Sequence, residues 1–345
     1  MRPLFALLTA ALLAACQNGG NVDAACTATP AIWGSGEAGL VNGSASQTRL
    51  ANPATVETAP DGSVFVADFN NDTVRLIRGC VSSTLVDGST AAPLTFQRPF
   101  GLSLGDDVLY IQTDGNDVGA RDATTGTVWR YDLATGALTM LAHNLGRPRG
   151  LQALPDGRVA LSDPRHHVLS ILDPATGNVT PLAGTADSSG FADATGSAAR
   201  FNAPYGIALG SDGALLVADF NNQRIRHVTL AGVVTTLAGS GTQGNANGAA
   251  LSASFAFPED VAVAGNAVLI ADVGNHLIRR LEAGTVSTQA GDGTAGFVDA
   301  PGTSAEFFGL EGIAATADGG ALWIADGTGG DDAQPYNRVR RIPLP

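Results

Sequence analysis

Three carboxylates stand at the starts of repeated segments of this chain, and their side chains suit cation binding. Glu259 and Asp260 follow Pro258, and Glu311 takes the place of Glu259 in the next segment. Carboxylate oxygens are the ligands that Ca²⁺ prefers. Glu259, Asp260 and Glu311 are therefore candidate metal ligands, with ion pairing to Arg149 or a solvated acidic rim as the alternatives.

The same place in the remaining segments holds a different side chain each time: Ala54, Phe100, Arg149 and Tyr205. A residue repeated in every segment is typical of a scaffold, whereas a residue that breaks the repetition is a candidate for recognition. We predict that these positions ring one opening. The predicted ligand-binding residues are Phe100, Arg149, Tyr205, Glu259 and Glu311.

Two other motif types offer weaker chemistry. The pattern GxGxxG occurs at 34–39, 239–244 and 291–296, but a strand rather than a helix is expected after each, so a phosphate-binding helix terminus is missing. A zinc site would need converging histidines, and none of the five histidines begins an innermost strand of a repeat. We expect neither a nucleotide nor a zinc cofactor.

The elements that must position the candidate residues form a repeat. Each copy has an apolar strand, an Asp-Gly type turn and a second strand that ends in aspartate, followed by two further strands. The aspartates at 68, 163, 219, 272 and 326 mark five copies, and a double gap hides a sixth with Thr113 in that place. Repeats of this length with four strands each predict an all-β, six-bladed β-propeller.

The two ends of the repeat region complete each other. The last copy lacks an outer strand, and residues 28–36 align with the outer strand at 233–241. We therefore expect the N-terminal strand to complete the last blade, with residues 28–345 forming one propeller.

The segments at 66–77 (VADFNNDTVRLI), 217–228 (VADFNNQRIRHV) and 270–281 (IADVGNHLIRRL) resemble NHL repeats. The resemblance implies the propeller fold but not one function, because such propellers serve as enzymes, sensors, adhesive modules and RNA binders. Gluconolactonase-like propellers hold a metal at the channel mouth. This similarity makes a metal-dependent lactonase, with Ca²⁺ at the mouth, the alternative to a binding module.

Composition narrows the partners. All 19 basic residues are arginine, and 32 acidic residues give a net charge of −13. Without a basic stripe, the chain lacks the electrostatic attraction that supplies most of the affinity for nucleic-acid phosphates. We expect no nucleic-acid partner and a monomer.

The N-terminus predicts export and a lipid anchor. Residues 1–15 hold one arginine and an apolar run too short to span a bilayer, and Leu13-Ala14-Ala15-Cys16 resembles a bacterial lipobox. Cys16 would carry the lipid, residues 16–27 would form a tether, and Gln17 favours the outer membrane, facing the periplasm or the exterior. In an oxidising envelope Cys26 and Cys80 either pair or remain free thiols.

We call the face with the loops between blades, and between second and third strands, the top face. Two insertions, 114–126 and 327–337, flank it. Large loops in a compact domain are usually functional. The sequence therefore predicts a lipid-anchored module that binds a protein or glycan through the top face. The repeated aspartates, and the arginines at 75, 226, 279 and 340, are predicted to be structural.

Overall fold

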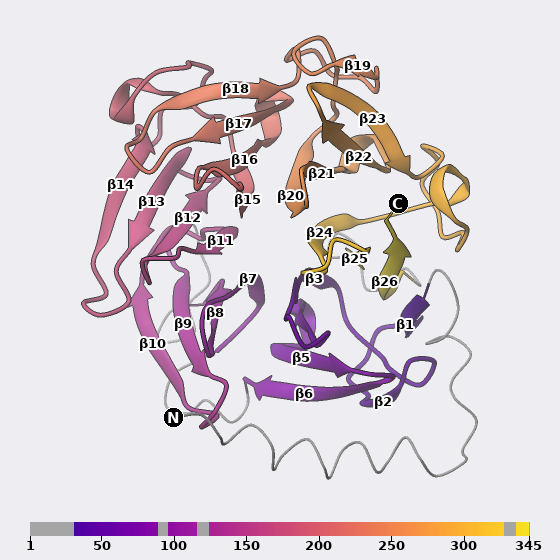
Figure 1. The fold of residues 1–345 in the computed structure, drawn as a ribbon. Helices are drawn as coiled ribbons and strands as arrows, with labels where there is room; N and C mark the ends of the chain where they lie inside the picture. The colour runs from indigo at the N-terminus through magenta and orange to yellow at the C-terminus, as the bar shows by residue number, and fades with distance from the viewer. Residues whose placement is uncertain (1–30, 89–95, 116–123, 328–335, 345) are drawn as a thin grey trace.

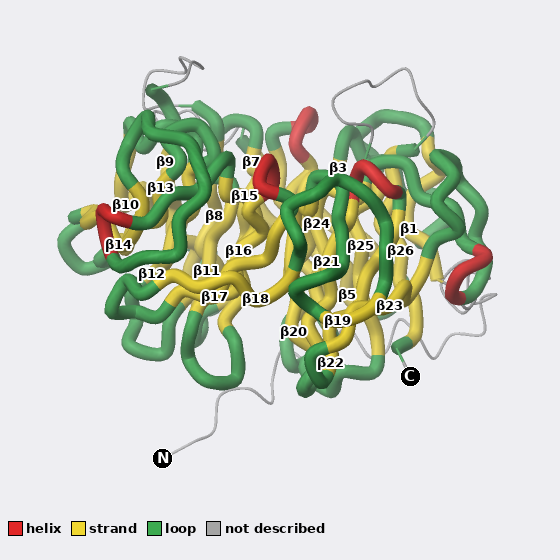
Figure 2. The backbone as a smooth tube through the Cα atoms, turned by 90° about the horizontal axis from the view of Figure 1, so that it is seen from above, coloured by secondary structure: helices red, strands yellow, loops and turns green. Residues whose placement is uncertain are grey.

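The computed structural model describes residues 31–88, 96–115, 124–327 and 336–344. Within these ranges the strands form six antiparallel sheets arranged in a ring (Figure 1). The strands run between two faces on which the loops gather (Figure 2). The chain is an all-β, six-bladed propeller, as predicted.

Strands are given from the channel outward. Blade 1 contains β3 (Pro53–Thr58), β4 (Val64–Asp68), β5 (Thr73–Arg78), β6 (Val81–Asp87) and the short β2 (Gly43–Ser44). Blade 2 contains β7 (Pro99–Leu104), β8 (Val108–Thr113), β9 (Thr127–Asp132) and β10 (Leu138–His143). Blade 3 contains β11 (Gly150–Ala153), β12 (Val159–Asp163), β13 (Val168–Leu172) and β14 (Val179–Gly184).

Blade 4 contains β15 (Pro204–Leu209), β16 (Leu215–Asp219), β17 (Arg224–Val228) and β18 (Val234–Ala238). Blade 5 contains β20 (Pro258–Ala264), β21 (Ala267–Asp272), β22 (Leu277–Glu282), β23 (Thr285–Ala290) and the short β19 (Gly248–Ala249). Blade 6 contains β24 (Leu310–Ala315), β25 (Ala321–Asp326), β26 (Asn337–Pro343) and β1 (Ala31–Gly36). The short fifth strands of blades 1 and 5 come from loops between blades and were not predicted.

The N-terminal strand closes the ring. Strand β1 pairs antiparallel with β26, with Ala31 opposite Arg341 and Gly36 opposite Asn337. Trp33 on β1 is buried, with its ring centroid 4.7 Å from that of Trp323 on β25. The predicted completion of the last blade is confirmed.

The core lies between neighbouring blades. Second strands such as β4 (VFVAD) and β16 (LLVAD) are buried along their whole length because another blade covers each face. Tight hairpin turns connect first and second strands; Gly62 has φ 83°, and Asp61 accepts a hydrogen bond from the Ser63 backbone N–H at 2.9 Å. No helix in the described ranges is long and apolar enough to cross a membrane.

Buried ion pairs hold the loops between blades. Asp219 accepts a hydrogen bond from the Arg226 guanidinium at 2.6 Å, and neither side chain is exposed to solvent. The Nη2 atom of Arg226 donates to Asp193 and to the Ala192 carbonyl oxygen in the preceding loop. The equivalent buried pairs are Asp68–Arg75, Asp272–Arg279 and Asp326–Arg340. The predicted structural role of these residues is confirmed.

Blades 2 and 3 replace this ion pair. In blade 2, Trp129 stands where blades 1, 4, 5 and 6 have arginine and donates to Thr127 at 2.7 Å, beside Thr113. In blade 3, Asp163 pairs with His166 at 2.6 Å. Blades 2 and 3 thus lack the arginine that pairs with the repeated aspartate in the other blades. These two blades form the cationic side of the channel mouth described below.

Candidate functional site at the channel mouth

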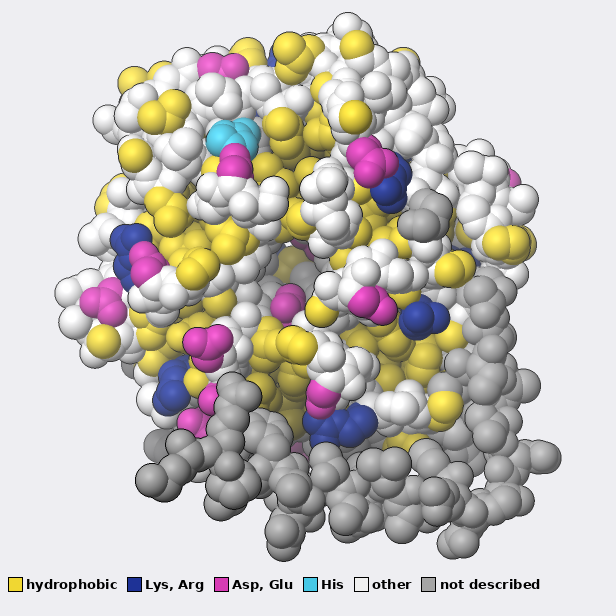
Figure 3. All heavy atoms as spheres, viewed as in Figure 1, with side chains coloured by type: hydrophobic (Ala, Val, Ile, Leu, Met, Phe, Trp, Pro, Cys, Tyr) yellow, Lys and Arg dark blue, Asp and Glu magenta, His cyan; other side chains and the backbone are white. Residues whose placement is uncertain are grey.

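A cavity of about 230 Å³ occupies the centre of the ring and is lined by residues of all six inner strands or of the segments that lead into them. Figure 3 shows the ring hollowed at its centre. All five predicted ligand-binding residues line this cavity: Phe100, Arg149, Tyr205, Glu259 and Glu311. Ala54, at the corresponding place in blade 1, is instead fully buried beside Phe69 and Phe100.

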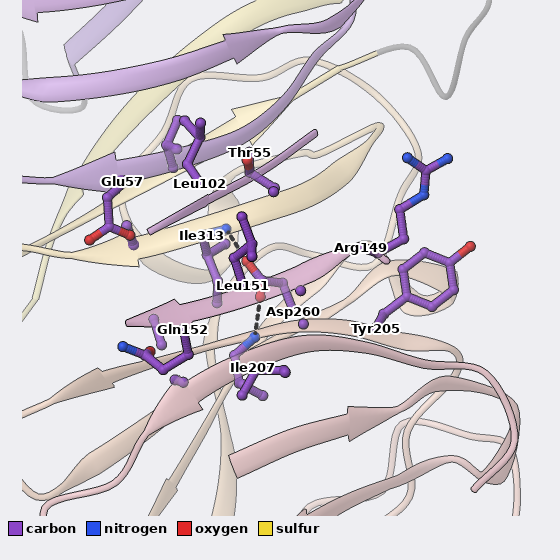
Figure 4. A pocket seen from close by; sticks show the side chains of 18 of the residues that line it. Thr55, Glu57, Leu102, Arg149, Leu151, Gln152, Tyr205, Ile207, Asp260 and Ile313 are labelled. Carbon is purple, nitrogen blue, oxygen red and sulfur yellow. Dashed lines mark hydrogen bonds between the residues drawn. The ribbon is translucent and has the colours of Figure 1, made fainter. Parts of the chain in front are cut away.

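The cavity has two ends of different character. Figure 4 shows Arg149 and Tyr205 at one end, Asp260 in the middle and Glu57 with Gln152 toward the other end. Arg149 and Tyr205 each follow the proline at the start of a blade, so their end is the mouth on the top face.

An arginine cluster forms one side of the mouth. Arg149 binds both carboxylate oxygens of Asp114, at 2.6 and 3.3 Å, and Arg147 binds the same carboxylate at 2.6 Å. Burial raises the pKa of Asp114, but the two guanidinium groups outweigh it and hold this pKa below its ordinary value. Asp114 is therefore an ionised clamp for both arginines. We did not predict it, because it lies at the start of the blade 2 insertion rather than at a repeated position.

Aromatic rings support this side. The Arg149 guanidinium lies 4.2 Å from the Phe100 ring centroid, and Phe100 meets Phe69 edge to face at 6.0 Å. In the neighbouring blade 4, the Phe220 ring lies 5.0 Å from that of Tyr205 and 5.1 Å from that of Phe257. Tyr205, Phe220 and Phe257 are all half-buried. The rim thus offers aromatic surface to a ligand.

Carboxylates form the opposite side. Burial raises the pKa of Glu259 well above its ordinary value, and the nearby charges of Glu311 and Asp260 raise it further, while Arg149 lowers it. The two glutamates come from neighbouring blades, and their mutual repulsion favours a shared proton. The mouth therefore separates charge, with guanidinium groups toward blades 2 and 3 and carboxyl groups toward blades 5 and 6.

Asp260 links two blades. Its carboxylate accepts hydrogen bonds from the backbone N–H groups of Ile313, at 2.8 Å, and Val261, at 2.9 Å. Four other blades have glycine at its position: Gly101, Gly150, Gly206 and Gly312. Thr55 takes this place in blade 1 and donates a hydrogen bond to the Phe100 carbonyl oxygen. The position therefore faces the next blade, and burial raises the pKa of Asp260 to about 7.

A second set of polar side chains joins blades near the far end of the cavity. Gln152 accepts a hydrogen bond from the Leu209 backbone N–H at 3.0 Å, and Ser103 accepts one from that of Ala153 at 2.9 Å. Glu57, in the corresponding place of blade 1, is bonded by the backbone of Leu104, and burial raises its pKa to about 8. The sequence analysis did not predict these positions. The available signal was a polar residue inside an innermost strand, at a place where blades 4 to 6 have alanine.

Several of the predicted features involve residues that the structure does not describe. Cys16, Cys26 and most of the 114–126 and 327–337 insertions lie outside the described residues. Cys80 is disulfide-bonded, and its partner also lies outside them, so pairing with Cys26 stays a prediction. In the described ranges, no group of three or more His, Cys, Asp or Glu side chains is arranged to hold a metal. The proposed Ca²⁺ site at Glu259, Asp260 and Glu311 remains a prediction.

Comparison with known proteins identifies the repeats. The NHL repeat family model matches residues 201–228 and 255–281. Protein SUPPRESSOR OF QUENCHING 1, chloroplastic, from Arabidopsis thaliana is 32% identical over 164 residues, 42% of this chain and 15% of that protein. NHL repeat-containing protein 2 from Bos taurus is 30% identical over 190 residues, 52% of this chain and 21% of that protein. The chain thus matches only a small part of each relative.

The fold matches solved propellers. An auxiliary nutrient binding protein from Bacteroides thetaiotaomicron VPI-5482 superposes with a TM-score of 0.68 at 18% identity, covering 88% of this chain and 72% of that one. At this identity the similarity shows the fold alone. The chain is thus a six-bladed β-propeller in which two segments match the NHL repeat model.

Proposed function

We propose that this protein is a binding module that captures its ligand at the channel mouth on the top face. The observation that carries the proposal is the convergence on one cavity of five side chains that break the repeat. Hydrogen bonds between blades fix the innermost strands that carry these side chains. The mouth is therefore preorganised, which lowers the entropic cost of binding a ligand. The shared fold of a nutrient binding protein is consistent with this role.

We also propose that a lipid on Cys16 holds the propeller, as a monomer, at the outer membrane. Strand β1 begins opposite Arg341, on the face away from the top loops, so the preceding tether would leave from the bottom face. The top face would then point away from the membrane, toward the periplasm or the exterior, to meet a small ligand, a glycan or a protein.

Binding is tested by thermal shift with a panel of sugars, amino acids, peptides, amines and nucleotides. We expect one class to raise the Tm of the wild-type protein, and Tyr205→Ala to remove that shift. Arg158→Ala, on an exposed hairpin turn, is the matched control and keeps it. A panel without any shift, or a shift that survives Tyr205→Ala, contradicts binding at the mouth.

Anchoring is tested by fractionation of cells that express the full chain. Cys16→Ser is expected to move the protein from the membrane to the soluble fraction. An unchanged distribution contradicts the anchor while leaving the binding proposal intact.

A further inference from the structure

The arginine side of the mouth carries net positive charge. Arg147 and Arg149 share the single carboxylate of Asp114, which is almost fully buried and ionised. Among the residues that the structure describes in this cluster, two cations against one anion leave one positive charge. A guanidinium has five N–H donors in a planar fork, and the bonds from Arg149 to Asp114 use only part of that capacity.

The carboxyl side carries net negative charge. Glu259 and Glu311 both line the cavity, and the charge of Glu311 raises the pKa of Glu259. A pair that shares one proton holds one negative charge. The charge of Arg149 also favours the ionised form of Glu259, while Arg149 forms an ion pair with Asp114 at 2.6 Å.

Tyr205 lies between the two sides. Its blade stands between blade 3, which supplies Arg149, and blade 5, which supplies Glu259. The charges of Glu259, Glu311, Arg149 and Arg147 all act on its hydroxyl, which places this group within reach of both sides. Tyr205 and Phe100 both line the cavity, and each follows the proline that begins its inner strand.

Charge complementarity selects the ligand class. A simple cation would be attracted by the carboxyl side but repelled by the arginines. A simple anion would be attracted by the arginines but repelled by the carboxylates. Resting on the proposed function, we propose that the mouth binds a zwitterionic amino compound, an amino acid or short peptide, with its ammonium group at Glu259 and Glu311 and its carboxylate at Arg149. Its apolar body then contacts Tyr205 and Phe100.

The test is calorimetric titration of the full propeller with the dipeptide alanyl-phenylalanine. Its N-acetylated form lacks the ammonium group, and its C-terminal amide lacks the carboxylate. We expect the free dipeptide to bind and each blocked form to bind at least about tenfold more weakly, as expected for loss of a hydrogen bond to a charged group. Arg158→Ala is the control variant.

Variants assign each charge to its side. Glu259→Gln is expected to weaken the free dipeptide about tenfold but to leave the N-acetylated form unchanged, because that form has no ammonium group. Arg149→Met is expected to weaken the free dipeptide and to leave the amide unchanged. Circular dichroism checks that both variants fold.

Equal affinity for the free and blocked dipeptides overturns the zwitterion proposal, as does absence of binding. If another class in the ligand panel still gives a shift that Tyr205→Ala removes, the binding function stands and only the ligand class is wrong. If no class gives such a shift, both proposals fail.

Discussion

At the residue scale, the repeated aspartates and arginines are structural charges. Asp219 and Arg226 are both fully buried, so removing Arg226 leaves the Asp219 carboxylate without its opposite charge. Breaking such a pair costs about 3–5 kcal/mol. We therefore expect Arg226→Met to lower the free energy of unfolding by about this amount in urea denaturation.

The matched control is Arg158→Met. Arg158 forms an ion pair with Asp156 at the same distance, 2.6 Å, but both side chains are nearly half exposed. Exposed pairs contribute about 0–1 kcal/mol. Similar losses in the two variants would contradict the structural role of the buried pair.

Glu57 makes stability depend on pH in an unusual direction. Its pKa rises from 4.5 to about 8 on folding, so between these values the folded protein holds a proton that the unfolded chain releases. The free energy of unfolding therefore falls as pH rises through this window. We expect Glu57→Gln to remove this contribution, so that its unfolding free energy falls less steeply between about pH 5 and 8 than that of the wild type.

The control for this pH dependence is Asp318→Asn. Asp318 is exposed, and hydrogen bonds from Thr316 and the Gly320 backbone lower its pKa, so it titrates below this window. If Glu57→Gln and the wild type have parallel curves between about pH 5 and 8, the raised pKa of Glu57 is wrong.

At the element scale, innermost strands pack closely because four of the six blades have glycine at the position that Asp260 takes in blade 5. A Cβ atom on Gly206 would lie 2.6 Å from the Cα atom of Asp260 in the next blade. We expect Gly206→Ala to cost about 1–3 kcal/mol of unfolding free energy because two backbones must separate.

Gly320→Ala is the control for the close approach. Its nearest neighbour would be the exposed Asp318 carboxylate at 3.3 Å, so its effect should stay within about 0.5 kcal/mol. Equal effects of Gly206→Ala and Gly320→Ala, measured by chemical denaturation, would exclude tight inner-strand packing as the cause.

The closing strand is a second element that chemical denaturation can test. Trp33 of β1 is 3% exposed and packs on Trp323 of the same blade. Truncating a buried tryptophan to alanine costs about 3–5 kcal/mol. We expect this loss for Trp33→Ala, and little change for Leu230→Ala, whose side chain is 37% exposed. A small effect of Trp33→Ala would mean that β1 does not hold the ring closed.

At the scale of the whole molecule, the repeats predicted the fold. The copies around Asp68, Asp219 and Asp272 share one pattern, so strand order and ring closure followed from alignment within the chain. The five ligand-binding candidates could be predicted for the same reason, because they differ at one repeated position.

Contacts between blades could not be predicted in this way. The Asp114 clamp joins an insertion of blade 2 to residues that open blade 3, and the bond of Asp260 to the Ile313 backbone crosses from blade 5 to blade 6. Both depend on how closely neighbouring blades approach, which no local pattern encodes. The charge separation at the mouth therefore emerged only from the assembled ring.

The most direct test of binding at the mouth is a crystal structure of the propeller with the panel compound that raises its Tm most. We expect ligand density on the top face, in contact with Arg149 and Tyr205 and within hydrogen-bond distance of Glu259. Density on the bottom face or against the outer strands, with the mouth unoccupied, would contradict it.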